Sequence, residues 1–244
     1  MVYETYNKIT SEDEFMRMFR IYRTTHEMLK DRGYVVPEGF NTYNYFNRHC
    51  VRDGELVYVF MILLFLKNIY CLFLICINHL TKKSKELMMF QVQKEHYPGD
   101  RILVLFPDNK TIGINYMKDV CVRLRDLQIG KAIIVYPGTF TIQASKAVQS
   151  MNSTEESLYK VELFSERELV VNITHHEFVP KHIVLSTEEK RTLLRKYNIK
   201  ETQLPRIQIT DPISKYLGVK RGQVIKITRL SEVSGRYISY RICY

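Results

Sequence analysis

The segment from Leu204 to Ile242 reads LPRIQITDPISKYLGVKRGQVIKITRLSEVSGRYISYRI. Within it, Val224–Thr228 and Tyr237–Cys243 alternate between apolar and polar residues, the pattern of a strand with one buried face. The residues between them, Ser231–Gly235, include small turn formers. We therefore predict a β-hairpin at this end of the chain.

Basic and aromatic side chains are interspersed along the same segment. They are Lys215, Lys220, Arg221, Lys226, Arg229, Arg236 and Arg241, together with Tyr216, Tyr237 and Tyr240. Arginine forks and tyrosine rings suit phosphate backbones and protein interfaces alike. The spacing of these residues does not distinguish a phosphate-binding surface from a protein interface. A third interpretation is a basic face that is simply solvated. The segment is best interpreted as a binding surface.

The net charge of +10 is concentrated in the same part of the chain. From His176 onward there are 14 Lys/Arg and 6 Asp/Glu, a balance of 14 − 6 = +8, whereas the first 175 residues hold 22 basic and 20 acidic residues. A basic terminal third indicates an anionic partner, whether nucleic acid, a membrane surface or an acidic protein.

Strands and helices are predicted to alternate from residue 100 onward. Ile102–Phe106 is a compact apolar run, a helical face over residues 117–127 follows with a stop at Gly130, and Ala132–Tyr136 is a second apolar run. Strand, helix and strand within this length predict a βαβ unit with parallel strands. A helix over Thr141–Met151 and strands at 160–164 and 169–173 complete the expected domain.

Helix ends are marked on either side of this region. Ser11 and Glu14 have the spacing of a capping box that opens an amphipathic helix, which Gly33 would end. Ser186 and Glu189 form a second capping box, for a helix that reaches about Tyr197. His175–Pro180 reads as a linker between two domains.

Catalytic motifs are absent from the sequence. It has no P-loop, GxGxxG, HExxH or GxSxG, and its five cysteines lack zinc spacing. Asp108-Asn109-Lys110 offers an acid and a lysine for a Mg²⁺ nuclease, but no second acid is placed beside them. We therefore expect no catalytic residue, metal or cofactor. The cysteine usage and the polar start favour the nucleus or cytosol.

Within residues 55–81, Val57–Leu66 and Ile69–Ile77 are apolar runs interrupted by Lys67 and Asn68, and Lys82, Lys83 and Lys85 follow the segment. Its length meets the criterion for a membrane-spanning helix. One interpretation is therefore a membrane-anchored basic binding protein that uses residues 56–80.

The segment that contains the motifs LPRI, DP, SGRY and YR closely resembles the C-terminal domain of the small subunit shared by eukaryotic RNA polymerases I, II and III. A small subunit of archaeal RNA polymerase is similar to this domain standing alone. The likeness extends through NITHHEFVPKH and, in the N-terminal part, DRGYVV, ILVLFPDN and AIIVYPG. It omits residues 55–81, which look like an insertion. The favoured hypothesis is a translated intron or faulty gene model, with a real surface insertion and a membrane span as alternatives.

The resemblance implies a structural subunit without catalysis of its own, located in the nucleus. Residues 1–173 would form a jaw domain with a mixed sheet, helices on both faces and a fold like restriction endonucleases without their active site. Residues 174–244 would form a small α+β assembly domain that docks on the largest polymerase subunit. The expected interface residues are Pro205, Arg206, Asp211, Pro212, Lys220, Arg221, Gly222, Arg229, Gly235, Arg236, Tyr237, Tyr240 and Arg241.

The jaw domain is also expected to lie near downstream duplex DNA and to meet transcription regulators. The family commonly opens the helix that faces DNA with a Thr-Pro-Ser-Ala type of loop, whereas this chain has TFTIQASK at residues 139–146. The proline is absent, but Thr141, Ser145 and Lys146 still offer hydroxyls and a charge to phosphates. Such contacts would be independent of DNA sequence and sensitive to salt.

Overall fold

A computed structural model of the chain describes residues 2–37, 88–95, 97, 99–153, 159–231, 233 and 235–244. The apolar segment 55–81 lies outside the described residues. The chain divides into two compact units, Met1–Val171 and Asn172–Tyr244. The expected domains 1–173 and 174–244, as independently folding parts, stay a prediction.

The first unit is built on a five-stranded sheet in the order β1-β2-β3-β5-β7. Its strands are β1 (Tyr34–Val35), β2 (Phe90–Lys94), β3 (Arg101–Leu105), β5 (Lys131–Tyr136) and β7 (Lys160–Ser165). The β1–β2 and β2–β3 pairs are antiparallel, whereas β3–β5 and β5–β7 are parallel. The sheet is therefore mixed, and the predicted parallel βαβ unit is confirmed.

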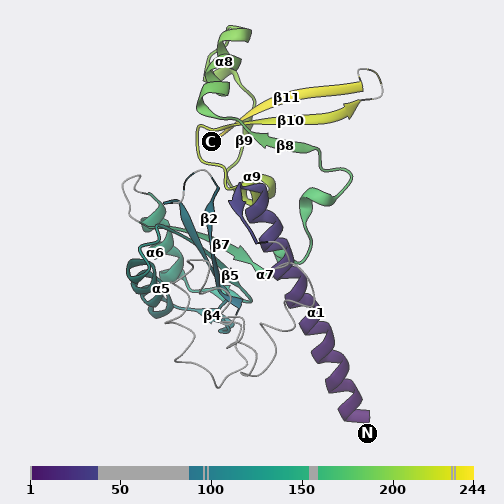
Figure 1. Cartoon of the computed structure of the whole chain (residues 1–244), viewed down its shortest axis with the longest axis vertical. Coiled ribbons are helices and arrows are strands. Elements are labelled where there is room, and N and C mark those ends of the chain that lie inside the picture. The colour runs from purple at the N-terminus through teal and green to yellow at the C-terminus, as the bar shows by residue number, and fades with distance from the viewer. Residues whose placement is uncertain are drawn as a thin grey trace. The chain divides into compact units, whose positions relative to one another are not determined.

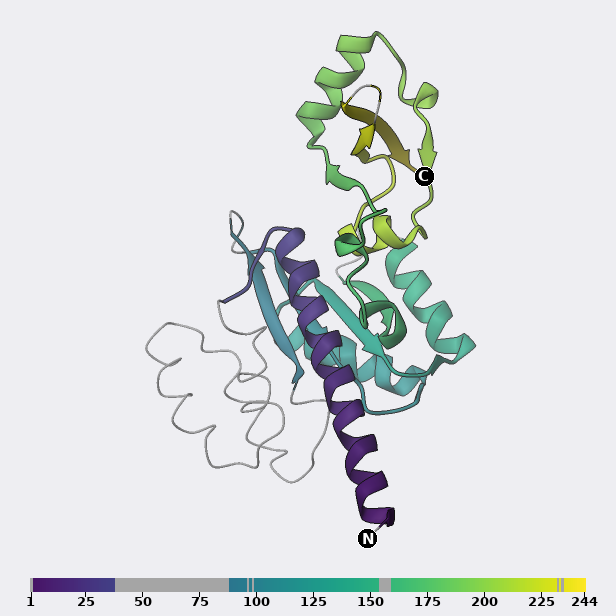
Figure 2. The ribbon, with the colours of Figure 1, turned by 90° about the vertical axis from the view of Figure 1, so that its right-hand side faces the viewer.

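Helices cover both faces of this sheet (Figures 1 and 2). On one side, α5 (Ile114–Asp126) and α6 (Ile142–Ser153) pack with alternate residues of the central strands, such as Leu103 and Ile134. On the other side, Tyr22 of α1 (Val2–Asp31) contacts Phe90 and Phe106. Successive side chains of a strand point to opposite faces of the sheet. A sheet with helices on both faces therefore needs strands that are apolar along nearly their whole length.

A close backbone crossing joins the loops at one end of the sheet. The two-residue strands β4 (Thr111–Ile112) and β6 (Thr139–Phe140) pair in parallel, and the Thr139 amide donates to the Lys110 carbonyl at 2.9 Å. Gly138 permits this approach, since a Cβ there would lie 2.0 Å from the Lys110 oxygen. The exposed Asp108-Asn109-Lys110 stretch thus leads into this crossing.

Three predictions for the part of the chain up to residue 175 are wrong. Helix α1 begins at Val2 instead of Ser11. After α5 the left-handed residue is Gln128, with φ of 54°, instead of Gly130. The strand expected over residues 169–173 is replaced by the short helix α7 (Glu166–Leu169) and the 3₁₀ turn η5 (Ile173–His175), because Ser165 and Asn172 accept hydrogen bonds from amides two residues ahead.

The second unit has a four-stranded sheet in the order β8-β10-β11-β9. Its strands are β8 (Lys181–Val184), β9 (Arg206–Ile207), β10 (Val224–Ser231) and β11 (Gly235–Cys243). The β10–β11 hairpin and the Ser186–Glu189 capping box are confirmed. Helix α8 (Thr187–Tyr197) ends at Tyr197, as expected.

Two small apolar cores lie on opposite faces of this second sheet. One joins Val224 and Ile242 to Leu193 of α8, and the other joins Ile225 and Cys243 to Val219, which follows α9 (Pro212–Leu217). We call these the α8 face and the α9 face. Along β10 and along β11 the side chains alternate between these two faces, so every second residue of a strand points to the same face.

In the part of the chain that the structure describes, no helix combines the length and the apolar character needed to cross a bilayer.

Candidate protein-docking surface

The register of the β10–β11 hairpin divides the expected interface residues between two faces. Ile225 lies opposite Arg241, and Arg229 lies opposite Tyr237, which places these side chains on the α9 face. Leu230 opposite Arg236 and Lys226 opposite Tyr240 belong to the α8 face. The expected interface residues therefore do not form one continuous plane.

On the α9 face the basic groups surround a histidine. His182 of β8 lies opposite Ile227, and its Nδ1–H donates a 2.6 Å hydrogen bond to the Pro180 carbonyl. Its pKa is lowered first by burial, while the hydrogen bond and the charge of Asp211 raise it and the charges of Arg229 and Arg241 lower it further. The strand register places both arginines on the same face as this imidazole.

On the α8 face the hairpin meets the end of helix α8. The ring of Tyr240 lies 6.3 Å from that of Tyr197, centroid to centroid, and Tyr240 packs against the core that contains Leu193. Arg236, four residues earlier on the same strand, is exposed. Tyr240 thus contributes to the core of this unit as well as to its surface.

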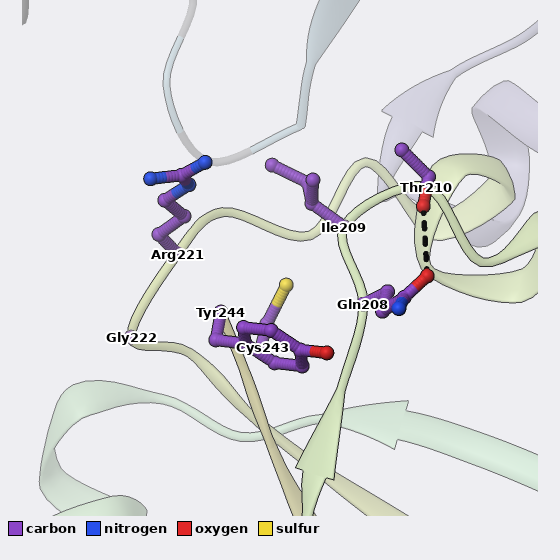
Figure 3. A pocket seen from close by; sticks show the side chains of 7 residues that line it. All are labelled: Gln208, Ile209, Thr210, Arg221, Gly222, Cys243 and Tyr244. Atoms are coloured by element: carbon purple, nitrogen blue, oxygen red, sulfur yellow. Dashed lines mark hydrogen bonds between the residues drawn. The ribbon is translucent and has the colours of Figure 1, made fainter.

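A pocket of about 490 Å³ lies at the base of the hairpin (Figure 3). Its lining residues are Gln208, Ile209, Thr210, Arg221, Gly222, Cys243 and Tyr244. Figure 3 shows the Cys243 thiol directed into the space between Arg221 and Ile209. Burial raises the pKa of this thiol above its usual value, although the Arg221 charge opposes the change. The pocket therefore offers one cation beside a neutral, apolar wall.

Backbone pairing brings these pocket residues together. The Tyr244 amide donates to the Ile207 carbonyl at 3.1 Å, and the Ile209 amide donates to the Tyr244 carbonyl at 3.3 Å. The Arg206 guanidinium lies 5.8 Å from the centroid of the Tyr244 ring. Of the lining residues, the sequence analysis selected Arg221 and Gly222 but missed the other five. Only the parallel pairing of β9 with β11 could have identified them, and nothing local in the sequence indicates it.

Four of the expected interface residues have local structural roles. The Asp211 carboxylate caps α9 by accepting from the Ile213 amide at 2.9 Å, and Pro212 occupies the first turn of that helix. Gly222 and Gly235 have φ of 80° and 68°, a region that disfavours side chains. These residues shape the surface whether or not they touch a partner.

The remaining predicted positions lie on exposed parts of this unit. Pro205, Arg206, Lys220 and Arg221 are exposed near the base of the hairpin, whereas Arg229, Arg236 and Tyr237 are exposed towards its tip. Strand β10 is eight residues long, so base and tip are about 23 Å apart at a strand's rise per residue. The structure therefore groups the predicted residues into a base cluster and a tip cluster.

The predicted DNA-proximal residues open helix α6 in the first unit. The Thr141 hydroxyl accepts from the Ala144 amide at 3.3 Å, and the Thr141 carbonyl accepts from the Ser145 amide at 2.9 Å. Thr141 and Ser145 are half-buried, whereas Lys146 and the apolar Ile142 are exposed. The Thr141 hydroxyl thus caps the start of α6. Lys146 is the most exposed of the three and is therefore the most accessible to a phosphate.

Within the described ranges, no three or more His, Cys, Asp or Glu side chains gather in a way that could hold a metal ion. The second unit presents a basic base cluster and a basic and apolar tip with the hairpin between them, which makes it a candidate surface for protein contact.

Comparison with known proteins identifies the family of this chain. The model of the RNA polymerase Rpb5 C-terminal domain matches residues 171–243, and that of the Rpb5 N-terminal domain matches residues 12–58. A Caenorhabditis briggsae protein named DNA-directed RNA polymerases I, II, and III subunit RPABC1 is 46% identical over 236 residues, covering 95% of this chain and 97% of its own length. The chain belongs to the RNA polymerase Rpb5 family.

Two other relatives support the assignment of this chain to the Rpb5 family. The Caenorhabditis elegans protein of the same name is 35% identical over 236 residues, with 95% of this chain and 97% of that protein covered. A Dictyostelium discoideum protein named DNA-directed RNA polymerases I, II, and III subunit rpabc1 is 46% identical over 159 residues, which are 65% of this chain and 79% of that protein. The resemblance first inferred from residues 204–242 is confirmed.

Proposed function

We propose that this Rpb5-family chain is a subunit shared by the DNA-directed RNA polymerases I, II and III, and that it supports transcription without catalysis of its own. The observation that carries the proposal is the match to relatives of that name over nearly the whole of both chains. The basic docking surface agrees with a subunit whose task is assembly.

The second unit, in this proposal, docks on the largest polymerase subunit. The hairpin presents Arg221 at its base and Arg229 and Arg236 at its tip, and none of the three has an ion pair among the described residues. Exposed arginines beside tyrosines are typical anchors of protein interfaces, because the guanidinium can bind carboxylates and stack on rings. An acidic or mixed surface on the partner is therefore expected.

The first unit would form part of the lower jaw near downstream DNA, with a fold like restriction endonucleases. Its mixed sheet with helices on both faces supports this assignment. Lys146 would contact the phosphate backbone, and transcription regulators could meet the same unit. The nucleus is the corresponding location.

The test is affinity capture of the tagged full-length chain from nuclear extract, with identification of the captured proteins. We expect the largest subunits of all three polymerases in the eluate. Recovery with membranes and without polymerase subunits would overturn the proposal in favour of a membrane-anchored binding protein. Cleavage of DNA by the purified chain, lost in Asp108→Ala, would instead favour a nuclease.

A further inference from the structure

Strand β11 has an outer edge that is mostly unpaired among the described residues. On its inner side it pairs with β10 along its length, from Gly235 to Ile242. On its outer side only Ile242 and Cys243 pair with β9. Figure 1 shows β10 and β11 continuing together beyond β8. The hairpin therefore ends as a two-stranded ribbon.

Three residues direct their backbone groups to this outer edge. The Ile242 amide points outward, since it donates to the Pro205 carbonyl at 2.8 Å, whereas the Cys243 amide points inward to the Gln223 carbonyl at 2.9 Å. Backbone groups alternate between the two sides of a strand. The amides and carbonyls of Arg236, Ile238 and Tyr240 therefore face outward, like those of Ile242.

Such an edge is a liability when it stays uncovered. A long exposed edge is a template for pairing with another chain, and proteins usually protect it with proline, inward charges or a covering segment. β11 contains no proline. Its ribbon carries large apolar side chains in water, with Leu230 90% and Val233 99% exposed. A two-stranded ribbon is also only marginally stable by itself.

The charges around the edge indicate what would cover it. Residues 224–244 contain four basic side chains, Lys226, Arg229, Arg236 and Arg241, and a single acidic one, Glu232. Arg229 and Arg241 lie on the α9 face, whereas Lys226 and Arg236 lie on the α8 face, to which Leu230, Ile238 and Tyr240 add apolar and aromatic surface. A strand beside β11 would therefore meet cations on both faces and apolar groups on the α8 face.

We propose that β11 receives an added strand from another polymerase subunit, an extended segment that is rich in acidic residues and also carries apolar ones. Its backbone pairs with Arg236, Ile238 and Tyr240. Its acidic side chains lie near Arg241 on the α9 face and near Arg236 on the α8 face, and its apolar side chains pack on Ile238. Main-chain hydrogen bonds supply affinity in this mode, and alternate side chains supply specificity. The inference rests on the proposed function and specifies how the docking occurs.

Hydrogen exchange at single-residue resolution tests the strand directly, in the free full-length chain and in the captured polymerase. The amides of Tyr237 and Ser239 face β10, so they should exchange slowly in both states. We expect the amides of Arg236, Ile238 and Tyr240 to exchange fast in the free chain and about tenfold or more slowly in the complex, because each gains a hydrogen bond shielded from water.

A matched pair of variants tests the same edge through binding. Ile238→Pro removes an outward amide and leaves the β10 ladder intact, a position where proline is tolerated in a strand. Ile238→Val keeps the amide and most of the apolar surface. We expect Ile238→Pro to reduce capture by tenfold or so, the factor equivalent to about 1.4 kcal/mol, and Ile238→Val to be captured as the unchanged chain is.

The outcomes separate this inference from the proposed function. If the chain is captured with polymerase while the three outward amides exchange as fast as in the free chain, strand addition is wrong and the subunit assignment stands. Equal capture of Ile238→Pro, or slow exchange of these amides already in the free chain, also overturns it. Absence of polymerase subunits from the captured material overturns both.

Discussion

The backbone carbonyl oxygen of Lys110 occupies the space beside Gly138 in which any other residue would need to place its Cβ atom. The two positions would be 2.0 Å apart. The crossing holds the loop after β3 against the loop after β5, because Thr139 and Thr141 donate to the carbonyls of Lys110 and Ile112 at 2.9 and 3.0 Å. The PG dipeptide that ends the second apolar run thus has a steric explanation.

Gly138→Ala is expected to destabilise the first unit by about 1–3 kcal/mol, the range for overpacking against atoms that cannot move freely. Gly99→Ala is the control, since no atom lies within 4 Å of a Cβ there and its φ is not in the left-handed region. Urea unfolding of the full-length variants measures the difference. Equal stability of both would show that the loops separate easily.

Burial of His26 predicts a pH dependence of stability. The ring is 1% exposed, stacks on Phe90 with centroids 4.1 Å apart, and has a pKa lowered by burial from 6.5 to about 4. Because the folded-state pKa is the lower one, the stabilisation is present above pH 6.5 and is lost as pH falls towards 4. The total loss is about 3 kcal/mol.

His26→Phe should therefore flatten the dependence of unfolding free energy on pH between 6.5 and 4. The exposed His176 provides the control, and His176→Phe should leave the dependence as it is in the unchanged chain. Denaturation curves at several pH values measure both. A slope unaffected by His26→Phe would contradict a neutral, buried imidazole.

Asp211 is expected to act through the stability of the second unit. Asp211→Ala removes the cap on the Ile213 amide and should cost about 1 kcal/mol of unfolding free energy. Asp211→Ser retains a capping oxygen and should cost much less. Thermal or urea unfolding distinguishes them. If both variants were equally stable but only one were captured by polymerase, Asp211 would be a direct contact instead.

Charge reversal tests the base and tip clusters together. Arg221→Glu combined with Arg236→Glu should reduce capture by the largest subunit by about tenfold or more, since like charges at an interface are costly. Both side chains are exposed, so the fold should persist. Lys118→Glu combined with Arg125→Glu, on helix α5, makes the same change of charge elsewhere. Similar losses in both double variants would indicate a general charge effect.

Lys146 is expected to contribute to salt-sensitive association with DNA. Lys146→Glu should lower the slope of log affinity against log salt concentration by about one, the value for one phosphate contact. Purified polymerase carrying the variant, titrated with downstream duplex at several salt concentrations, gives the slope. Lys118→Glu serves as the control. An unchanged slope would remove Lys146 from the DNA-contacting residues.

Local signals explain what the sequence could predict. The β10–β11 hairpin, the βαβ unit and the Ser186–Glu189 capping box depend on residues close in the chain, and all three are present. The expected strand at residues 169–173 failed because an apolar run does not distinguish a strand from a short buried helix, and Ser165 favours the helix.

Distant pairing explains what the sequence could not predict. Strand β1 was missed because its partner strand, β2, is distant in the sequence. The pocket depends on β9 pairing in parallel with β11, which brings Gln208 next to Tyr244. The division of the arginines between two faces follows from the hairpin register, which neither composition nor motif specifies.

The position of β1 at the border of the first sheet has a consequence for the length of the chain. Tyr34 and Val35 lie beside Lys94 and Gln93, so two points far apart in the sequence are neighbours at the border of the sheet. The entropic cost of bringing two such points together grows slowly, by about 0.6 kcal/mol for each doubling of the length of chain between them. A gene can therefore gain or lose a stretch such as 55–81 at this point with little penalty to the sheet. Variation in protein length within the family is expected to concentrate there.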